Sequence, residues 1–175
     1  MCTKHNVLLI VDEIQTGYGR TGKFWAHNWD GIRPDIVTTA KSFSGGFMPA
    51  SAALCDSHIM DLVGPGDHGS TYGGNSLAMA VAYASLKTLL EEGMIENSAA
   101  MGKHLMSGLK SIKSPLFKEV RGRGLFLGIE IKDGVGVDGN DFAKVLFKKG
   151  LITKATHDMT CRFSPALVIT KSEVE

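Results

Sequence analysis

The sequence predicts an α/β protein made of two parts, and three patterns indicate this. A continuous apolar run with an acidic end, VLLIVDE at 7–13, is typical of a parallel strand buried on both faces. A second β-branched run at 34–41 and a strongly helical segment from 76 to about 92 follow it, as in an α/β layer. Beyond Pro115 the sequence favours a strand, a glycine-rich turn, a helix and a further strand edge, which predicts a smaller α+β unit.

The expected elements follow from periodicity and from turn residues. In the first part we expect strands at 7–13, 34–41 and 50–55, a glycine-rich loop at 64–75, and helices at 76–92 and 95–112. In the second part we expect a strand at 125–132, a helix at 140–150 and a strand edge within CRFSPAL. The apolar side chains that repeat along the first long helix are Leu77, Val81, Ala84, Leu86, Leu89 and Leu90.

The two ends of the chain carry their own signals. The chain begins almost directly on a buried-type strand, with no earlier element to pair with it. It closes on LVITKSEVE, where Thr170 as N-cap and Glu173 at the third helical position form a capping box. We therefore expect a helix that begins at the end of the chain, and we expect the chain to be a piece of a longer one.

Composition narrows the class of protein. The 175 residues are 43% hydrophobic and 21% charged, with a net charge of +1, which gives no reason to expect nucleic acid or an anionic membrane as a partner. No apolar run is long enough to span a bilayer, and the first residues lack a secretory signal. Three widely spaced cysteines favour a reducing compartment. We expect a soluble intracellular protein of the cytoplasm or the mitochondrial matrix.

The segment GYGRTGKF at 17–24 fits two phosphate-binding patterns, but each lacks a required neighbour. A P-loop needs Ser or Thr after its lysine and a helix that begins there. Here Phe24 follows Lys23, and the next residues are too broken for a helix. The dinucleotide pattern G-x-G-x-x-G needs the same helix. The sequence therefore argues against a P-loop NTPase and against a nicotinamide-dependent enzyme. The six histidines lack metal-ligand spacing, so we expect no metal site.

Asp12 and Lys41 stand at the carboxyl ends of two expected strands, where open α/β sheets hold ligands. Lys41 is either a surface lysine or an amine that does covalent chemistry, and the two side chains are either a salt bridge or parts of one site. The segment HGSTYGGN adds Ser70 and Thr71 with flanking glycines just before a helix, which suits a phosphate. An amine, a carboxylate and a phosphate loop are together what pyridoxal phosphate requires.

The run VDEIQTGYGRTGKF…PDIVTTAKSFSGG…PGDHGSTYGGN resembles the class III pyridoxal-phosphate-dependent aminotransferases. Within them, the segments SGG, ALCDSHIM and PGDHGSTYGGN are more similar to the ornithine branch than to the acetylornithine branch. The resemblance also covers VRGRGL and CRFSPALVIT, and it matches the C-terminal portion of such an enzyme. It implies the fold-type I transferase fold. Residues 1–113 would be part of the large, mostly parallel sheet domain with connecting helices, and 114–175 a truncated small α+β domain.

The resemblance implies a role for each residue of the first part that matches the family. Lys41 would form the Schiff base with the cofactor and then carry the proton. Asp12 would pair with the pyridine nitrogen, and Gln15 would reach the ring hydroxyl, unless it merely caps a loop. Thr71, with Ser70 beside it, would hold the phosphate.

Among the arginines, the resemblance singles out one. Arg162 in CRFSPAL matches the arginine that takes the α-carboxylate of the keto-acid substrate, with a structural ion pair as the alternative. The sequence gives no such reason for Arg20, Arg121 or Arg123, which we expect to be turn or surface residues.

The reaction that the resemblance implies is transfer of the δ-amino group of ornithine to 2-oxoglutarate, giving glutamate-5-semialdehyde and glutamate. The mechanism would be ping-pong, through aldimine and ketimine, in ornithine, arginine and proline metabolism. In the family the phosphate loop comes from the neighbouring subunit, which implies a homodimer or higher oligomer. The alternatives are an aminotransferase for acetylornithine or 4-aminobutyrate, and a catalytically incomplete chain, because the family's upstream substrate-pocket residues are absent from this sequence.

Overall fold

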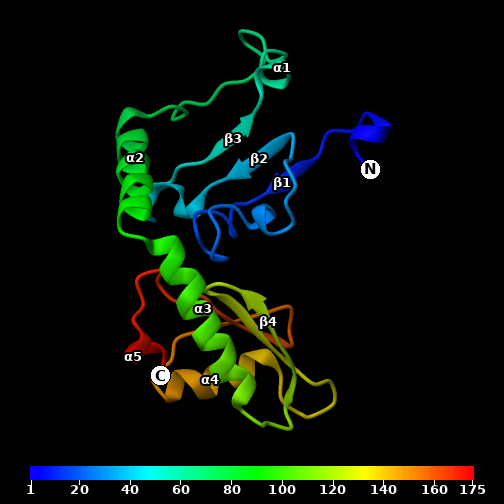
Figure 1. The fold of residues 1–175 in the computed structure, drawn as a ribbon, viewed down its shortest axis with the longest axis vertical. Helices are drawn as coiled ribbons and strands as arrows, with labels where there is room; N and C mark the ends of the chain where they lie inside the picture. The colour runs from blue at the N-terminus through cyan, green and yellow to red at the C-terminus, as the bar shows by residue number, and fades with distance from the viewer. The chain divides into compact units, whose positions relative to one another are not determined.

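The computed structural model describes all 175 residues, and these fall into two units (Figure 1). The first unit comprises Met1–Tyr18 and Lys23–Gly93, and the second comprises Gly19–Gly22 and Met94–Glu175. Contacts thus group residues 94–113 with the second unit. The domain boundary between residues 113 and 114, which concerns the domains of the family fold, stays a prediction.

The first unit contains a three-stranded mixed sheet in the order β1-β2-β3. Its strands are β1 (Ile10–Asp12), β2 (Ile36–Thr39) and β3 (Ala52–Cys55). β1 and β2 run parallel, with Asp12 beside Thr38, whereas β3 is antiparallel to β2. All three strands fall within the ranges that the sequence predicts.

The burial predicted for the first strand is wrong. Only Ile10–Asp12 forms β1, and Val7, Leu8 and Ile10 are each more than half exposed. The physical reason is position, since β1 is an edge strand with a partner on one side only. An apolar run therefore predicts the parallel pairing correctly here, but it does not predict burial on both faces.

The helical elements of the first unit are one long helix and several single turns. They are η1 (Thr3–His5), η2 (Ala26–Trp29), η3 (Lys41–Ser44), α1 (Ser57–Met60) and α2 (Ser76–Glu91). The Asn75 side chain caps α2 by accepting a hydrogen bond from the Ala78 amide at 3.0 Å. η3 packs against α2 so closely that a Cβ on Gly45 would lie 2.9 Å from the Ser85 hydroxyl.

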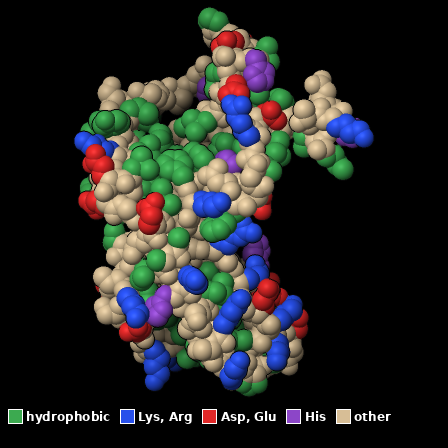
Figure 2. Space-filling model, viewed as in Figure 1, with side chains coloured by type: hydrophobic (Ala, Val, Ile, Leu, Met, Phe, Trp, Pro, Cys, Tyr) green, Lys and Arg blue, Asp and Glu red, His purple; other side chains and the backbone are tan.

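The buried face of α2 differs from the apolar stripe that the sequence predicts. Ala78, Ala82 and Leu89 are buried, whereas Leu77 and Leu90 are each about 60% exposed (62% and 59%). Figure 2 shows hydrophobic side chains gathered on the visible face of the first unit. Small residues thus mark the packed face of this helix, because they allow the close approach of η3.

The second unit is an antiparallel four-stranded sheet with helices. The strands are β4 (Phe117–Arg123), β5 (Phe126–Ile131), β6 (Lys154–Thr156) and β7 (Thr160–Phe163), and the helices are α3 (Met94–Ser111), α4 (Gly139–Lys148) and α5 (Lys171–Val174). The strand order is β4-β5-β7-β6. The short α5 carries the predicted capping box, in which Thr170 and Glu173 exchange hydrogen bonds. None of the helices has the length and apolarity needed to cross a membrane.

The core of the second unit lies on one face of this sheet. Leu127, Ile129 and Ile131 alternate along β5 and are almost fully buried, together with Cys161 and Phe163 of β7. Helices α3 and α4 cover this core with apolar side chains: Leu105, Met106, Leu109, Phe142, Ala143 and Leu146. The strands β5 and β7 therefore form the packed centre of this unit.

Candidate active site

The edge of the sheet in the first unit brings the two predicted reactive groups to the same end. Asp12 is the last residue of β1, and Lys41 is the first residue of η3, directly after β2 and Ala40. Because β1 and β2 are parallel and in register at Asp12 and Thr38, both residues leave the sheet at the same edge. This is the placement that the sequence predicts. The catalytic roles of both residues stay a prediction.

The backbone of Lys41 adopts an uncommon conformation, with φ of 48° in the left-handed region. For a side chain other than Gly, Asn or Asp this costs about 1 kcal/mol or more, and such residues gather at functional sites. The surrounding structure fixes the strained turn. The Phe43 amide donates to the Ala40 carbonyl at 3.0 Å, and the Phe43 ring stacks on Tyr18 at 5.9 Å. The Lys41 side chain itself is exposed.

A cleft of about 520 Å³ lies at Lys41. The loop before α2 contributes Ser70, Tyr72, Gly73 and Gly74 to its lining. The structure therefore brings together Lys41 and Ser70, two of the predicted site residues, within one chain. The volume is in the range that a small molecule or cofactor requires.

The other predicted residues of the first unit do not line this cleft. Gln15 and Thr71 have exposed side chains. Asp12 is also exposed, and its carboxylate accepts a hydrogen bond from the Ile14 amide at 2.9 Å. This bond orients the carboxylate at the start of the loop that follows β1. Asp12, Gln15 and Thr71 are therefore not among the residues that line the cleft with Lys41.

The donor set at this edge fits pyridoxal phosphate. Lys41 supplies a primary amine, Asp12 a carboxylate and Ser70 a hydroxyl, beside the start of a 16-residue helix. A helix N-terminus carries partial positive charge, which favours a phosphate. The glycines of the loop leave room in the cleft, because they have no side chains to fill it.

A buried network beside Asp12 was not predicted from the sequence. The Glu13 carboxylate has no exposed surface, and it accepts hydrogen bonds from the Thr16 hydroxyl at 2.5 Å and from the His27 amide at 2.9 Å. The His27 ring nitrogen Nδ1 lies 2.9 Å away as well. Burial alone would raise the pKa of Glu13, but these hydrogen bonds, with one from the Ala26 amide, lower it overall. These hydrogen bonds connect Glu13, at the start of the loop after β1, to His27 of η2.

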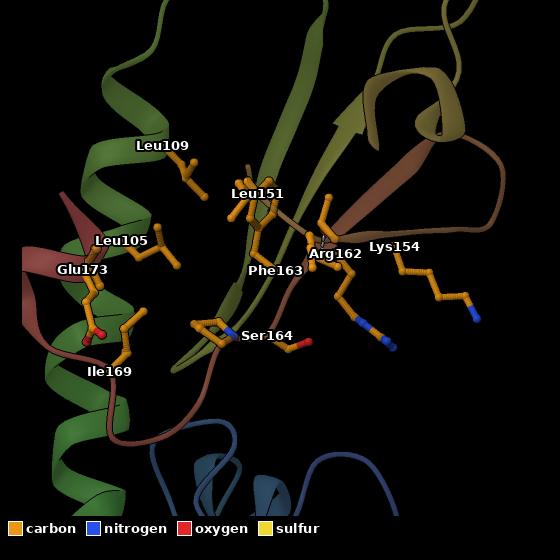
Figure 3. A pocket seen from close by; sticks show the side chains of 13 residues that line it. Leu105, Leu109, Leu151, Lys154, Arg162, Phe163, Ser164, Ile169 and Glu173 are labelled. Atoms are coloured by element: carbon orange, nitrogen blue, oxygen red, sulfur yellow. Dashed lines mark hydrogen bonds between the residues drawn. The ribbon is translucent and has the colours of Figure 1, made fainter. Parts of the chain in front are cut away.

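Arg162 lies in the second unit, on β7, opposite Gly128 of β5 and Lys154 of β6. Its guanidinium lies 5.9 Å from the centroid of the Phe126 ring. Arg162 and Lys154 line one end of a pocket of about 480 Å³, and Figure 3 shows both side chains extending in the same direction. The predicted alternative of a structural ion pair is wrong, because no carboxylate lies within 4.0 Å of the guanidinium.

Arg20 lies in a turn, as the sequence predicts, but its side chain has partners that the sequence does not predict. Its guanidinium donates to the carbonyls of Leu125 at 3.2 Å and Pro165 at 2.6 Å, and it is largely removed from solvent. Sequence reasoning missed it because its partners lie more than 100 residues away. Arg121, by contrast, pairs with Glu119 and Glu130 at the surface, as expected.

Comparison with known proteins gives concordant matches over the whole chain. A family described as "Aminotransferase class-III" matches residues 1–175. The ornithine aminotransferase of Staphylococcus carnosus is 45% identical, and the match covers 100% of this chain and 43% of that protein. The crystal structure of the ornithine aminotransferase from Toxoplasma gondii ME49 aligns with a TM-score of 0.94 at 43% identity, covering 99% of this chain and 42% of that one.

A relative whose name gives a different substrate is almost as similar. The acetylornithine aminotransferase structure from Elizabethkingia anophelis aligns with a TM-score of 0.93 at 41% identity, covering 99% of this chain and 46% of that one. The chain thus spans less than half the length of these relatives. The edge with Lys41, the α/β architecture and the family match over all 175 residues lead to one conclusion. The chain belongs to the class III aminotransferases.

Proposed function

We propose that this chain acts in pyridoxal-phosphate-dependent transamination, in which the δ-amino group of ornithine passes to 2-oxoglutarate. The products are glutamate-5-semialdehyde and glutamate, so one amino group and one carbonyl oxygen exchange places. The observation that carries the proposal is Lys41, which a fixed left-handed turn holds at the sheet edge beside a cleft of about 520 Å³. Membership of the class III family supports the same reading.

Lys41 is the residue on which the proposed chemistry depends. Pyridoxal phosphate, when bound, supplies a ring that accepts electrons from the substrate carbon next to the reacting amino group. Lys41 Nζ would bond to this cofactor at rest. During turnover the same amine would take the proton from the substrate carbon and later return it. The strained but well-supported backbone of Lys41 fixes the point at which its side chain leaves the edge of the sheet.

Other residues of the first unit would orient the cofactor. The Asp12 carboxylate would keep the ring nitrogen protonated, and its hydrogen bond with the Ile14 amide holds it for that task. Gln15 would donate to the ring hydroxyl. Ser70 and Thr71, near the N-terminus of α2, would hold the phosphate of the cofactor that the neighbouring subunit binds.

Arg162 would bind the α-carboxylate of the 2-oxo acid. Its guanidinium has no acidic partner, so its charge and its planar donors remain available to a carboxylate. We propose small amino acids and 2-oxo acids as substrates. We also propose a homodimer in which the loop at 64–75 contributes to the phosphate site of the neighbouring subunit.

A direct test follows the amino group. The protein is incubated with pyridoxal phosphate, 2-oxoglutarate and ornithine labelled with ¹⁵N at the δ-position, and glutamate is analysed by mass spectrometry. We expect ¹⁵N-glutamate with the wild-type chain and at least a 10³-fold slower rate with Lys41→Ala, since covalent and proton-transfer catalysis are both lost. Lys23→Ala, which removes a lysine bound to the Asn28 carbonyl, is the matched control.

Acetylornithine aminotransferase is the second candidate, because the structure of such an enzyme from Elizabethkingia anophelis is nearly as similar to this chain. The same assay with ¹⁵N-labelled N-acetylornithine separates the two. Faster transfer from N-acetylornithine than from ornithine would reverse the substrate assignment. A chain that transfers no label from either donor or from 4-aminobutyrate would be catalytically incomplete.

A further inference from the structure

The Arg20 side chain bridges the start of β5 and the end of β7, the two central strands of the second unit. Its guanidinium donates to the Leu125 carbonyl at 3.2 Å, directly before β5, and to the Pro165 carbonyl at 2.6 Å, two residues after β7. β5 and β7 are antiparallel neighbours, with Leu127 opposite Phe163, so the start of β5 and the end of β7 lie at the same edge. One planar side chain therefore bridges both strand ends.

Both ends of this bridge lie next to groups that position Arg162. Leu125 precedes Phe126, whose ring lies 5.9 Å below the Arg162 guanidinium. Pro165 follows Arg162 by three residues on the segment that leaves β7. On the other side, the Thr153 hydroxyl donates to the Arg162 carbonyl. The direction of the Arg162 side chain thus depends on strand ends that Arg20 holds.

The backbone of Arg20 is itself held by the second unit. The fully buried Ser98 hydroxyl donates to the Arg20 carbonyl at 3.3 Å and accepts from the Leu125 amide at 3.3 Å. In addition, a Cβ on the neighbouring Gly22 would lie 3.0 Å from Ala99 of α3. The residue is therefore anchored at both its main chain and its side chain, which is what a positioning residue requires.

The charges around these two arginines are unbalanced. Burial lowers the pKa of the Arg20 guanidinium, and the nearby charge of Arg162 lowers it further. Lys154, directly opposite Arg162 on β6, adds a third cation to the same edge. No carboxylate forms an ion pair with Arg20 or Arg162. Positive charges gathered in this way favour a bound anion, so this edge suits a carboxylate.

We propose that Arg20 is a positioning residue of the carboxylate site, which fixes the direction of Arg162 and adds a second positive charge for a dicarboxylate such as a 2-oxo diacid. The inference rests on the proposed function, because it takes Arg162 as the carboxylate-binding residue. Lysine cannot replace Arg20, since an ammonium lacks the planar fork that spans the Leu125 and Pro165 carbonyls.

The test measures dicarboxylate binding, without turnover. Titration calorimetry gives the dissociation constant of 2-oxoglutarate for the wild-type chain with pyridoxal phosphate, and for Arg20→Lys and Arg20→Gln. We expect about a tenfold weaker binding for Arg20→Lys and a larger loss for Arg20→Gln, which has neither the fork nor the charge. Arg33→Lys, at an exposed arginine paired with Asp56, is the control and keeps the wild-type constant.

Two readouts separate the possible failures. If 2-oxoglutarate does not protect Arg162 of the wild-type chain from phenylglyoxal, as followed by peptide mass spectrometry, the assignment of Arg162 in the proposed function fails. If protection is seen but the Arg20 variants bind 2-oxoglutarate as tightly as wild type, the proposed function stands and the role of Arg20 is overturned, whatever happens to the melting temperature.

A measurement on the unsubstituted chain covers variants that do not fold. In ¹H–¹⁵N spectra of arginine side chains, addition of 2-oxoglutarate is expected to shift the Nε–H signals of both Arg20 and Arg162. A shift of Arg162 alone would overturn the inference, because the ligand would then not sense the second guanidinium.

Discussion

Glu13 is a carboxylate without exposed surface, and the donors around it explain how it stays charged. The Thr16 hydroxyl and the His27 amide donate to it at 2.5 and 2.9 Å. The His27 ring Nδ1 lies at the same 2.9 Å as its amide, which places the proton of the neutral ring on Nδ1. A buried charge with this many donors ties the loop after β1 to η2, and Asp12 and Ile14 are its direct neighbours in the chain.

Replacement of Glu13 by glutamine tests this at the scale of one residue. The variant keeps the shape but loses the charge and turns one acceptor into a donor, so we expect a loss of about 2–4 kcal/mol of unfolding free energy at pH 7. Exposed Glu119, which pairs with Arg121 at 3.4 Å, is the control, and Glu119→Gln should change stability by less than about 0.5 kcal/mol. Urea denaturation followed by circular dichroism measures both.

The pH dependence of the same variant has a definite sign. The pKa of Glu13 is lowered in the folded state from its ordinary value of 4.5, so its contribution is present above that value. The contribution is lost as the pH falls through the folded-state pKa. The wild-type advantage over Glu13→Gln should therefore shrink as the pH falls below about 4.5. An advantage that stays constant down to pH 3 would contradict the ionised network.

At the scale of elements, helix α3 packs against the turn between β4 and β5 through one glycine. Gly102 is buried, and a Cβ there would lie 2.2 Å from the backbone carbon and oxygen of Gly124. Gly124 itself has a positive φ of 55°, and a Cβ there would lie 2.3 Å from the backbone carbon of Thr21. Backbone cannot move aside as a flexible side chain can, so the packing depends on the missing side chain at both positions.

The glycines of α3 offer a matched pair of substitutions. Gly102→Ala should destabilise the protein by about 1–3 kcal/mol or more, because of the clash with Gly124. Gly108→Ala, on the same helix with nothing within 4 Å of the added carbon, should stabilise it by about 0.5–1 kcal/mol through helix propensity. Thermal unfolding decides: a similar shift for both variants would mean that the Gly102 contact is not formed.

The helices and strands show which elements the hydrophobic periodicity of the sequence predicts correctly. The strongly periodic α2 and α3 were predicted to within about one residue at each end, and the capping box at Thr170 and Glu173 was confirmed. β4 was missed, because FKEVRGR is mostly exposed and lacks an apolar alternation. The packed face of α2 was predicted only in part: Leu89 is buried, but so are Ala78 and Ala82, because close packing against η3 selects small residues, which a hydrophobicity pattern underweights.

At the scale of the whole molecule, short sequence motifs predict some of the candidate functional residues and miss others. Lys41 and Ser70 carry local signals and line one cleft. Arg20 and Glu13 carry none. The Arg20 acceptors are 105 and 145 residues away along the chain, and Glu13 depends on His27 folding back over a loop. Contacts between residues so far apart in the chain depend on the tertiary structure, so a local sequence pattern does not predict them.

Exposed apolar side chains on the first unit support the proposed dimer. Leu77, Tyr83 and Leu90 of α2 are 62%, 71% and 59% exposed, and Figure 2 shows hydrophobic side chains gathered on this unit. On size exclusion with light scattering, we expect a mass of about twice 18.8 kDa when pyridoxal phosphate is present. Leu77→Lys should shift the protein towards the monomer, whereas a monomer in every condition would contradict the dimer.

We propose Lys41 as the amine that binds the cofactor, and chemical trapping of the bound cofactor tests this directly. The protein is mixed with pyridoxal phosphate, reduced with borohydride and digested, and the modified lysine is identified by mass spectrometry. We expect one dominant adduct on Lys41, with exposed lysines such as Lys87 and Lys144 as internal controls. Adducts spread evenly over the lysines, or none at all, would contradict it.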